Sequence, residues 1–193
     1  RRATKLVRGK LVTTLALLAK FAEESADLPA LGYTHFQPAQ PVAVGKRAAL
    51  WIQDILMDIE TLDGLAARLR MLGCRGTTGT QASFMELFEG DEAKVQALDS
   101  MIAGRMGFSG VYPVSGQTYP RKVDDECLHV LSAIAQSAMK FAVAIRLLQH
   151  EKENEEPYER GQLGSSAMSY KRHPLRTERI TPIASSRIAV AQD

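Results

Sequence analysis

Two long stretches of helical periodicity constrain the fold of this chain more than any other feature. Apolar side chains recur every three or four residues from Val44 to Leu69 and again from Val123 to Leu148. At that spacing they return to the same face of an α-helix. Each stretch therefore predicts a long amphipathic helix. We expect the first to open at Pro41, in its first turn, and to end near Gly73.

Two shorter stretches show the same period. Residues 4–26 place Leu11, Leu15 and Leu18 on one face, and a further helix is expected after Asp91, whose side chain is a plausible N-cap. Segments rich in glycine and proline separate the helices, at 27–41, 73–84 and 107–120. The prolines of the first segment exclude a continuous helix and predict an extended connection. We expect the last fifteen residues to form no closed unit, as in a fragment of a longer protein.

These features predict an all-α protein in which long antiparallel helices pack as a bundle at small crossing angles. Residues 1–193 are expected to form one helical-bundle domain, as the central portion of a longer protein. The net charge of +2, from 24 Lys and Arg against 22 Asp and Glu, predicts neither a nucleic-acid partner nor a membrane partner. The two cysteines lack a paired metal-binding spacing, so we expect no metal site and a cytoplasmic location.

The segment "YTHFQPAQ" places His35 between Thr34 and Gln37 in a connection between helices. A histidine flanked by hydroxyl and amide groups suits general acid or base catalysis, because it titrates near neutral pH. A structural loop histidine is the alternative that spacing leaves open.

Two further polar connections have both a binding and a structural interpretation. The amides and hydroxyls of "RGTTGTQAS" could hold a carboxylate or phosphate, although the segment lacks the ending of a Walker loop. "SGQTYPRK" contributes Gln117 just before the second long helix. Either segment could instead be a structural helix connection.

The segment 161–179, "GQLGSSAMSYKRHPLRTER", has the richest chemistry. Ser165 and Ser166 follow Gly164, and the cations Lys171, Arg176 and Arg179 come soon after. A serine hydroxyl can act as a base only when nearby amides and cations stabilise its alkoxide. A mobile, solvated basic loop is the alternative interpretation.

Four motifs occur in an order and spacing that resemble the adenylosuccinate lyase family, within the aspartase/fumarase superfamily. They are "THFQPAQP", "RGTTGTQASF", "GQTYPRK" and "GSSAMSYKRHP". The resemblance covers essentially the whole chain. It implies a homotetramer with a helical-bundle core and active sites shared between subunits, acting on a small anionic substrate without a metal or organic cofactor.

The reaction implied is β-elimination of fumarate from adenylosuccinate, giving AMP, and from the succinyl-carboxamide ribotide of purine biosynthesis. The resemblance assigns Ser165 as the base that removes the Cβ proton and His35 as the acid that protonates the departing nitrogen. It assigns the segment 161–179 as a flexible catalytic loop with its flank. The substrate-binding residues that it implies are Thr34, Gln117, Ser166, Lys171, His173 and Arg179.

The chain departs from the superfamily pattern at two loop positions: Ser169 stands at the usual proline and His173 at the usual asparagine. Family segments carrying a second active-site histidine and further substrate contacts lie outside these 193 residues. The alternatives are another superfamily lyase, such as argininosuccinate lyase, and a non-catalytic homologue resembling the lens crystallins.

Overall fold

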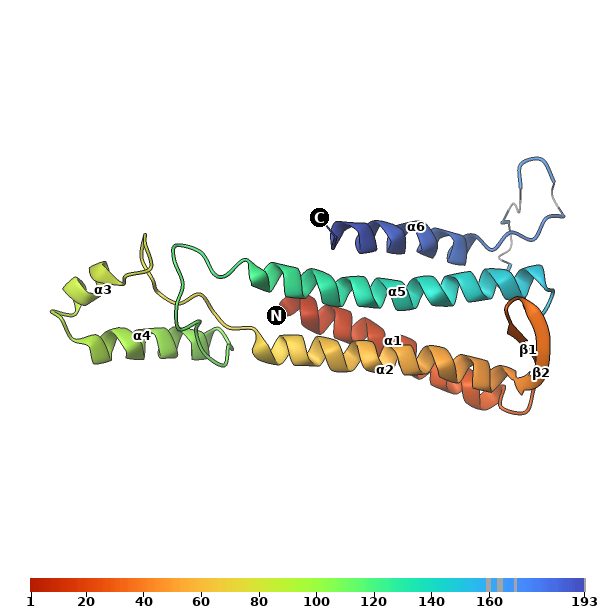
Figure 1. The fold of residues 1–193 in the computed structure, drawn as a ribbon, viewed down its shortest axis with the longest axis horizontal. Coiled ribbons are helices and arrows are strands. Elements are labelled where there is room, and N and C mark those ends of the chain that lie inside the picture. The colour runs from red at the N-terminus through yellow and green to blue at the C-terminus, as the bar shows by residue number, and fades with distance from the viewer. Residues whose placement is uncertain (159–160, 163–164, 169, 193) are drawn as a thin grey trace.

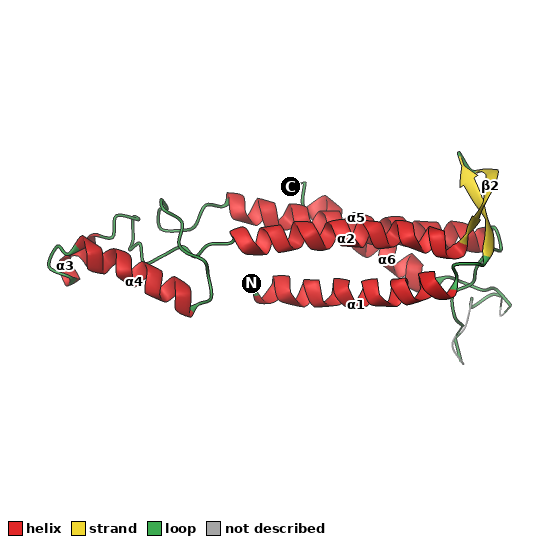
Figure 2. Cartoon of the chain, turned by 90° about the horizontal axis from the view of Figure 1, so that it is seen from below, coloured by secondary structure: helices red, strands yellow, loops and turns green. Residues whose placement is uncertain are grey.

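The structure, a computed structural model, describes residues 1–158, 161–162, 165–168 and 170–192, whose long helices lie side by side in an elongated bundle (Figure 1). Its elements in chain order are α1 (Arg2–Glu24), β1 (Pro29–Thr34), β2 (Gln37–Ala43), α2 (Val44–Arg68), α3 (Ala82–Leu87), α4 (Glu92–Arg105), α5 (Lys122–His150) and α6 (Leu175–Val190). Helices α1, α2, α5 and α6 form the bundle, and the short α3 and α4 lie beyond one end of it (Figure 2). The predicted all-α bundle of long antiparallel helices is confirmed.

The core lies where α2 and α5 cross α1. Leu62, Leu65 and Val130 are its buried centre, and the partly buried side chains of Val7, Leu11, Leu69, Cys127 and Ile134 pack against them. Further along, the Trp51 ring meets the Phe141 ring edge to face, with 4.9 Å between centroids. Such a pair adds roughly 0.5–1.5 kcal/mol beyond the area it buries. Leu62 belongs to the predicted apolar face of α2, whereas Leu65 and Val130 lie beside the predicted faces of α2 and α5.

The connection before α2 is extended, as predicted, but it is paired. Strands β1 and β2 form an antiparallel hairpin in which Thr34 pairs with Gln37 and Leu31 pairs with Pro41. Pro41 therefore does not open the helix, as we expected, since it belongs to β2 and α2 begins at Val44. A two-stranded ribbon tolerates proline because each strand has an edge that needs no ladder hydrogen bond.

The C-terminal region holds a helix that the sequence did not predict. Helix α6 packs against α5 and buries Thr177 and Ala184. It contains Pro182 in its interior. Proline removes one backbone hydrogen bond and normally breaks a helix, and packing against α5 offsets this loss. The predicted N-cap of α4 at Asp91 is confirmed, because the Asp91 carboxylate accepts a hydrogen bond from the Lys94 backbone amide at 3.1 Å.

By length and composition α5 alone among the described helices could cross a membrane. It packs here against both α2 and α6. The central helix of a bundle meets the same criteria, so this property is weak evidence for a membrane span.

Candidate functional site

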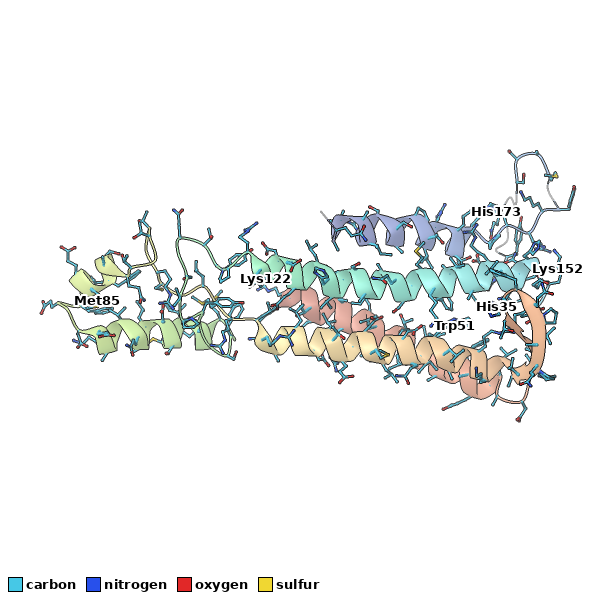
Figure 3. The ribbon with its side chains drawn as sticks, viewed as in Figure 1. His35, Trp51, Met85, Lys122, Lys152 and His173 are labelled. Carbon is cyan, nitrogen blue, oxygen red and sulfur yellow. The ribbon has the colours of Figure 1, made fainter. Side chains whose placement is uncertain are left out.

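The predicted site residues lie at opposite ends of the long helices. The hairpin with Thr34 and His35 and the connection from α5 to α6 with His173 lie at one end, whereas Lys122 marks the other end (Figure 3). Gln117 precedes Lys122 by five residues and lies in the connection that leads into α5. The 29 residues of α5 span about 43 Å at 1.5 Å per residue. The chain by itself thus brings His35 close to the α5–α6 connection but keeps Gln117 away from both.

His35 occupies the tip of the hairpin. The two residues of its turn, His35 and Phe36, have φ angles of 51° and 57°. A two-residue turn with both φ values positive suits glycine or asparagine, and bulky side chains there carry strain of order 1–3 kcal/mol each. The His35 side chain is exposed and borders a cavity of about 500 Å³ formed by the hairpin, the start of α2 and the end of α5.

A second cavity of about 740 Å³ lies along the end of α5, bordered by the connection to α6. Its basic lining residues are Arg146, His150, Lys152, Lys171, Arg172 and His173, and its acidic ones are Glu155 and Glu178. Lys171 and His173 are thus brought together in a mainly cationic hollow that suits an anion. Leu147 borders both cavities, so they open on either side of one helix.

His173 is already engaged within the chain. Its Nε2 atom makes a short contact with the Glu178 carboxylate on α6. Sequence reasoning singled out His173 but missed Glu178. A glutamate five residues from a histidine gives no signal until α6 is known to begin between them.

The two serines differ in their surroundings. Ser165 is partly buried and its hydroxyl oxygen accepts a hydrogen bond from the Ala167 amide at 3.3 Å, whereas Ser166 is exposed. A backbone donor of this kind favours the ionised hydroxyl that a serine base requires. Gly164 and Ser169 lie outside the described residues. Arg179, placed in the loop flank by sequence reasoning, is an exposed residue of α6.

Glu156 joins the two ends of the connection that carries the serines. Its carboxylate accepts hydrogen bonds from the amides of Arg176 and Thr177, at 3.1 and 2.9 Å, and from the Thr177 hydroxyl. Burial acts to raise the pKa of Glu156, but these hydrogen bonds outweigh it and the pKa lies below its ordinary value. Glu156 therefore caps the start of α6, a role that sequence reasoning missed because the partners are about twenty residues apart.

The hairpin is held by contacts that sequence reasoning also missed. Arg47 Nη2 donates a hydrogen bond to the Leu31 carbonyl oxygen at 2.8 Å and lies 2.8 Å from Glu153 Oε2. Burial and a hydrogen bond with the same Glu153 carboxylate raise the pKa of Tyr33. Strand β1, the start of α2 and the segment after α5 are thus joined through the hairpin that carries His35.

The segment "RGTTGTQAS" has a structural role. Arg75 lies 3.5 Å from the Asp99 carboxylate on α4, and the Gln81 amide donates to the same carboxylate at 3.2 Å. The Arg75 and Asp99 side chains are only 10% and 7% exposed. These groups fix the loop on α4, in line with the structural alternative. Among the described residues, His, Cys, Asp and Glu form no group of three or more that could hold a metal ion.

A bundle of long helices is also the fold of the similar solved structure and of the family described next. One similar solved structure is that of a 3-carboxy-cis,cis-muconate lactonizing enzyme from Pseudomonas putida. It superposes with a TM-score of 0.83 and 26% sequence identity, and the match covers 100% of this chain and 41% of that enzyme's chain. The profile of the lyase family matches residues 3–188, and the chain belongs to that family.

Two curated relatives are more similar in sequence. Adenylosuccinate lyase of Saccharomyces cerevisiae is 52% identical over 95% of this chain and 38% of that protein. The adenylosuccinate lyase of Schizosaccharomyces pombe is 51% identical over 93% of this chain and 37% of that protein. The chain thus spans less than two fifths of the length of the relatives it matches.

Proposed function

We propose that this chain is part of an adenylosuccinate lyase, which releases fumarate from adenylosuccinate and from the succinyl-carboxamide ribotide of purine biosynthesis. The observation that carries the proposal is the shared location of His35, Ser165 and the cationic cavity with Lys171 and His173 at one end of the bundle. A carbon–nitrogen elimination needs a base, an acid and fixed positive charge near a carboxylate. The two yeast relatives named adenylosuccinate lyase favour this substrate over argininosuccinate.

In this mechanism Ser165 removes a proton from Cβ of the succinyl group. The electron pair left on Cβ forms the double bond of fumarate while the carbon–nitrogen bond breaks, and His35 donates a proton to the departing nitrogen. The negative charge that gathers on the neighbouring carboxylate is stabilised by Lys171, a fixed cation that favours the intermediate over the ground state. Thr34, Ser166, His173, Arg179 and Gln117 bind the substrate in this proposal. No metal or organic cofactor takes part in these steps.

The active form is proposed to be a homotetramer in the cytoplasm with sites shared between copies. Large apolar side chains lie exposed along the helices, among them Leu17 at 66%, Met57 at 58% and Ile183 at 62%. Large apolar side chains exposed in this way are consistent with a protein interface along the bundle. The separation of Gln117 from His35 has the same implication, because another copy must supply Gln117 if both residues contact one substrate.

His173 makes this site different from the superfamily pattern. Its contact with Glu178 occupies the Nε2 atom, so a substrate that binds this nitrogen must compete with a carboxylate. We therefore propose that His173 positions the substrate through a different geometry from the usual asparagine. Ser169, the other departure from the superfamily pattern, lies outside the described residues.

The direct test is an assay of the purified full-length protein with adenylosuccinate, monitoring fumarate and AMP. Turnover of adenylosuccinate, with argininosuccinate and aspartate unreactive in parallel reactions, is the expected result. Ser165→Ala should reduce kcat by a factor of about 10²–10⁴, the contribution typical of positioned proton transfer. An intact tetramer without turnover of any of these compounds would support the crystallin-like alternative instead.

A further inference from the structure

We propose that Arg47 is a positioning residue for His35, and that it acts with Glu153 by holding the hairpin in its strained conformation. This inference rests on the proposed function, since it assigns His35 its role as the acid. The observation behind it is geometric: Arg47 joins the strand that leads to His35 to the segment that follows α5.

The Arg47 contacts are short and largely protected from water. Its Nη2 atom donates a hydrogen bond to the Leu31 carbonyl oxygen at 2.8 Å and lies 2.8 Å from Glu153 Oε2. The side chains of Arg47 and Glu153 are 17% and 19% exposed. Charged hydrogen bonds in such surroundings are stronger than neutral ones, and the two N–H groups of Nη2 can serve one acceptor each.

The hairpin needs such a support. Its turn places His35 and Phe36 at positive φ, and Phe36 is 78% exposed, so the turn residues themselves bury little that could hold this conformation. A strained backbone persists only where the surrounding structure imposes it. Leu31 lies on β1, the strand that runs directly into the turn. Loss of its contact with Arg47 is therefore expected to free the tip and displace the imidazole.

The groups around the anchor also fit this role. Tyr33, two residues before His35, has a raised pKa because of burial and the nearby Glu153 carboxylate, which pairs with Arg47. Arg47 and His35 border the same cavity, together with Lys46 and Glu151. Arg47 thus lies in the wall of the same hollow as His35. Displacement of a reacting group by about 1 Å costs on the order of 10²-fold in rate.

The test compares Arg47→Met, Arg47→Lys and Glu153→Gln in the full-length tetramer, with adenylosuccinate as substrate. We expect Arg47→Met to lower kcat by about 10–100-fold with KM changed by less than about 3-fold. Arg47→Lys should recover part of the loss, and Glu153→Gln should lower kcat by roughly 2–5-fold because it keeps an acceptor oxygen. Arg8→Met is the matched control, since it removes an Arg–Asp63 pair of 2.7 Å at the other end of the bundle.

A double variant separates positioning from general stability. If Arg47 acts through His35, Arg47→Met should lower kcat by less than about 3-fold in a His35→Ala background. An equal fold loss in both backgrounds, or wild-type kcat in a tetrameric Arg47→Met variant, would overturn this inference. If Arg47→Met does not assemble, the same comparison is made with Arg47→Lys. A wild-type enzyme that releases no fumarate would instead contradict the proposed function.

Discussion

Gly79 lies directly against the backbone of Ser115. A Cβ atom built on Gly79 would come within 2.1 Å of the Ser115 carbonyl oxygen and 2.9 Å of the Gly116 Cα. The two polar connections "RGTTGTQAS" and "SGQTYPRK" are thus in contact at the end of the bundle opposite the hairpin. Gln117 is the next residue along, so its position depends on this close approach.

Gly79→Ala is expected to destabilise the protein and to displace Gln117. Its φ of 84° adds strain to the steric overlap with backbone that cannot move easily. We expect a loss of about 2–4 kcal/mol in the free energy of unfolding, measured with urea, and a raised KM for adenylosuccinate. Gly76→Ala is the control, because its φ is 72° but its nearest neighbour, Ser83 Oγ, is 3.6 Å away. Equal losses in the two variants would show that contact with Ser115 is unimportant.

Asp99→Ala should be among the most destabilising substitutions at that end. The Asp99 carboxylate accepts hydrogen bonds from the Cys74 amide at 2.6 Å and from Gln81, and it pairs with the nearly buried Arg75. Removal of one partner of a buried pair costs about 3–5 kcal/mol, since the other charge is left uncompensated. Asp63→Ala, which breaks an exposed pair with Arg8, should cost less than about 1 kcal/mol. Urea denaturation of both variants provides the comparison, and similar losses would contradict the prediction.

Glu156→Gln should weaken the start of α6 in a pH-dependent way. Because the folded-state pKa of Glu156 lies below its ordinary value, its contribution is present at neutral pH and is lost as the pH falls through the folded-state pKa. The variant should be less stable than wild type by about 1 kcal/mol at pH 7, and the difference should shrink below about pH 4.3. Urea unfolding at several pH values measures this. A difference that does not change with pH would mean that the charge on Glu156 is immaterial.

Asp58→Asn is expected to raise the free energy of unfolding at neutral pH, whereas Glu156→Gln lowers it. Asp58 is 6% exposed, and its Oδ2 atom has no hydrogen-bond partner among the described residues. Burial raises its pKa, so the ionised carboxylate is unfavourable in the fold and the cost disappears as the pH falls through the raised pKa. We expect the variant to gain about 1 kcal/mol at pH 7 and to match wild type in acid. Asp54→Asn, one turn earlier and paired with Lys140 at 2.7 Å, should be neutral or slightly destabilising. A loss of stability in Asp58→Asn at pH 7 would contradict this view of the buried carboxylate.

The sequence was sufficient for the long helices because their apolar faces repeat along the chain, as the buried Ile55 and Leu62 illustrate. It was insufficient where distant segments decide the structure. The hairpin depends on pairing between proline-rich strands, and α6 forms despite Pro182 because α5 covers one of its faces. The contacts of Arg47 with Leu31 and Glu153, and of Glu156 with Thr177, join residues too far apart for any local pattern.

For the site, residue types and the family resemblance indicated His35, Ser165 and Lys171, and the structure places their segments at one end of the bundle. Gln117 was correctly placed just before the second long helix, but the position of His35 at the far end of that helix could not be predicted, because it depends on how the hairpin packs. Nor could the resemblance predict that His173 would contact Glu178, since this chain has an imidazole where the superfamily has an amide.

Complementation between inactive variants tests most directly whether this chain forms a lyase site between copies. His35→Ala and Gln117→Ala are each expected to be nearly inactive as full-length homotetramers. After the two proteins are mixed, dissociated and reassembled, sites that combine an intact His35 from one copy with an intact Gln117 from another should restore roughly a quarter of wild-type fumarate release from adenylosuccinate. Mixed tetramers that remain inactive would contradict the shared site.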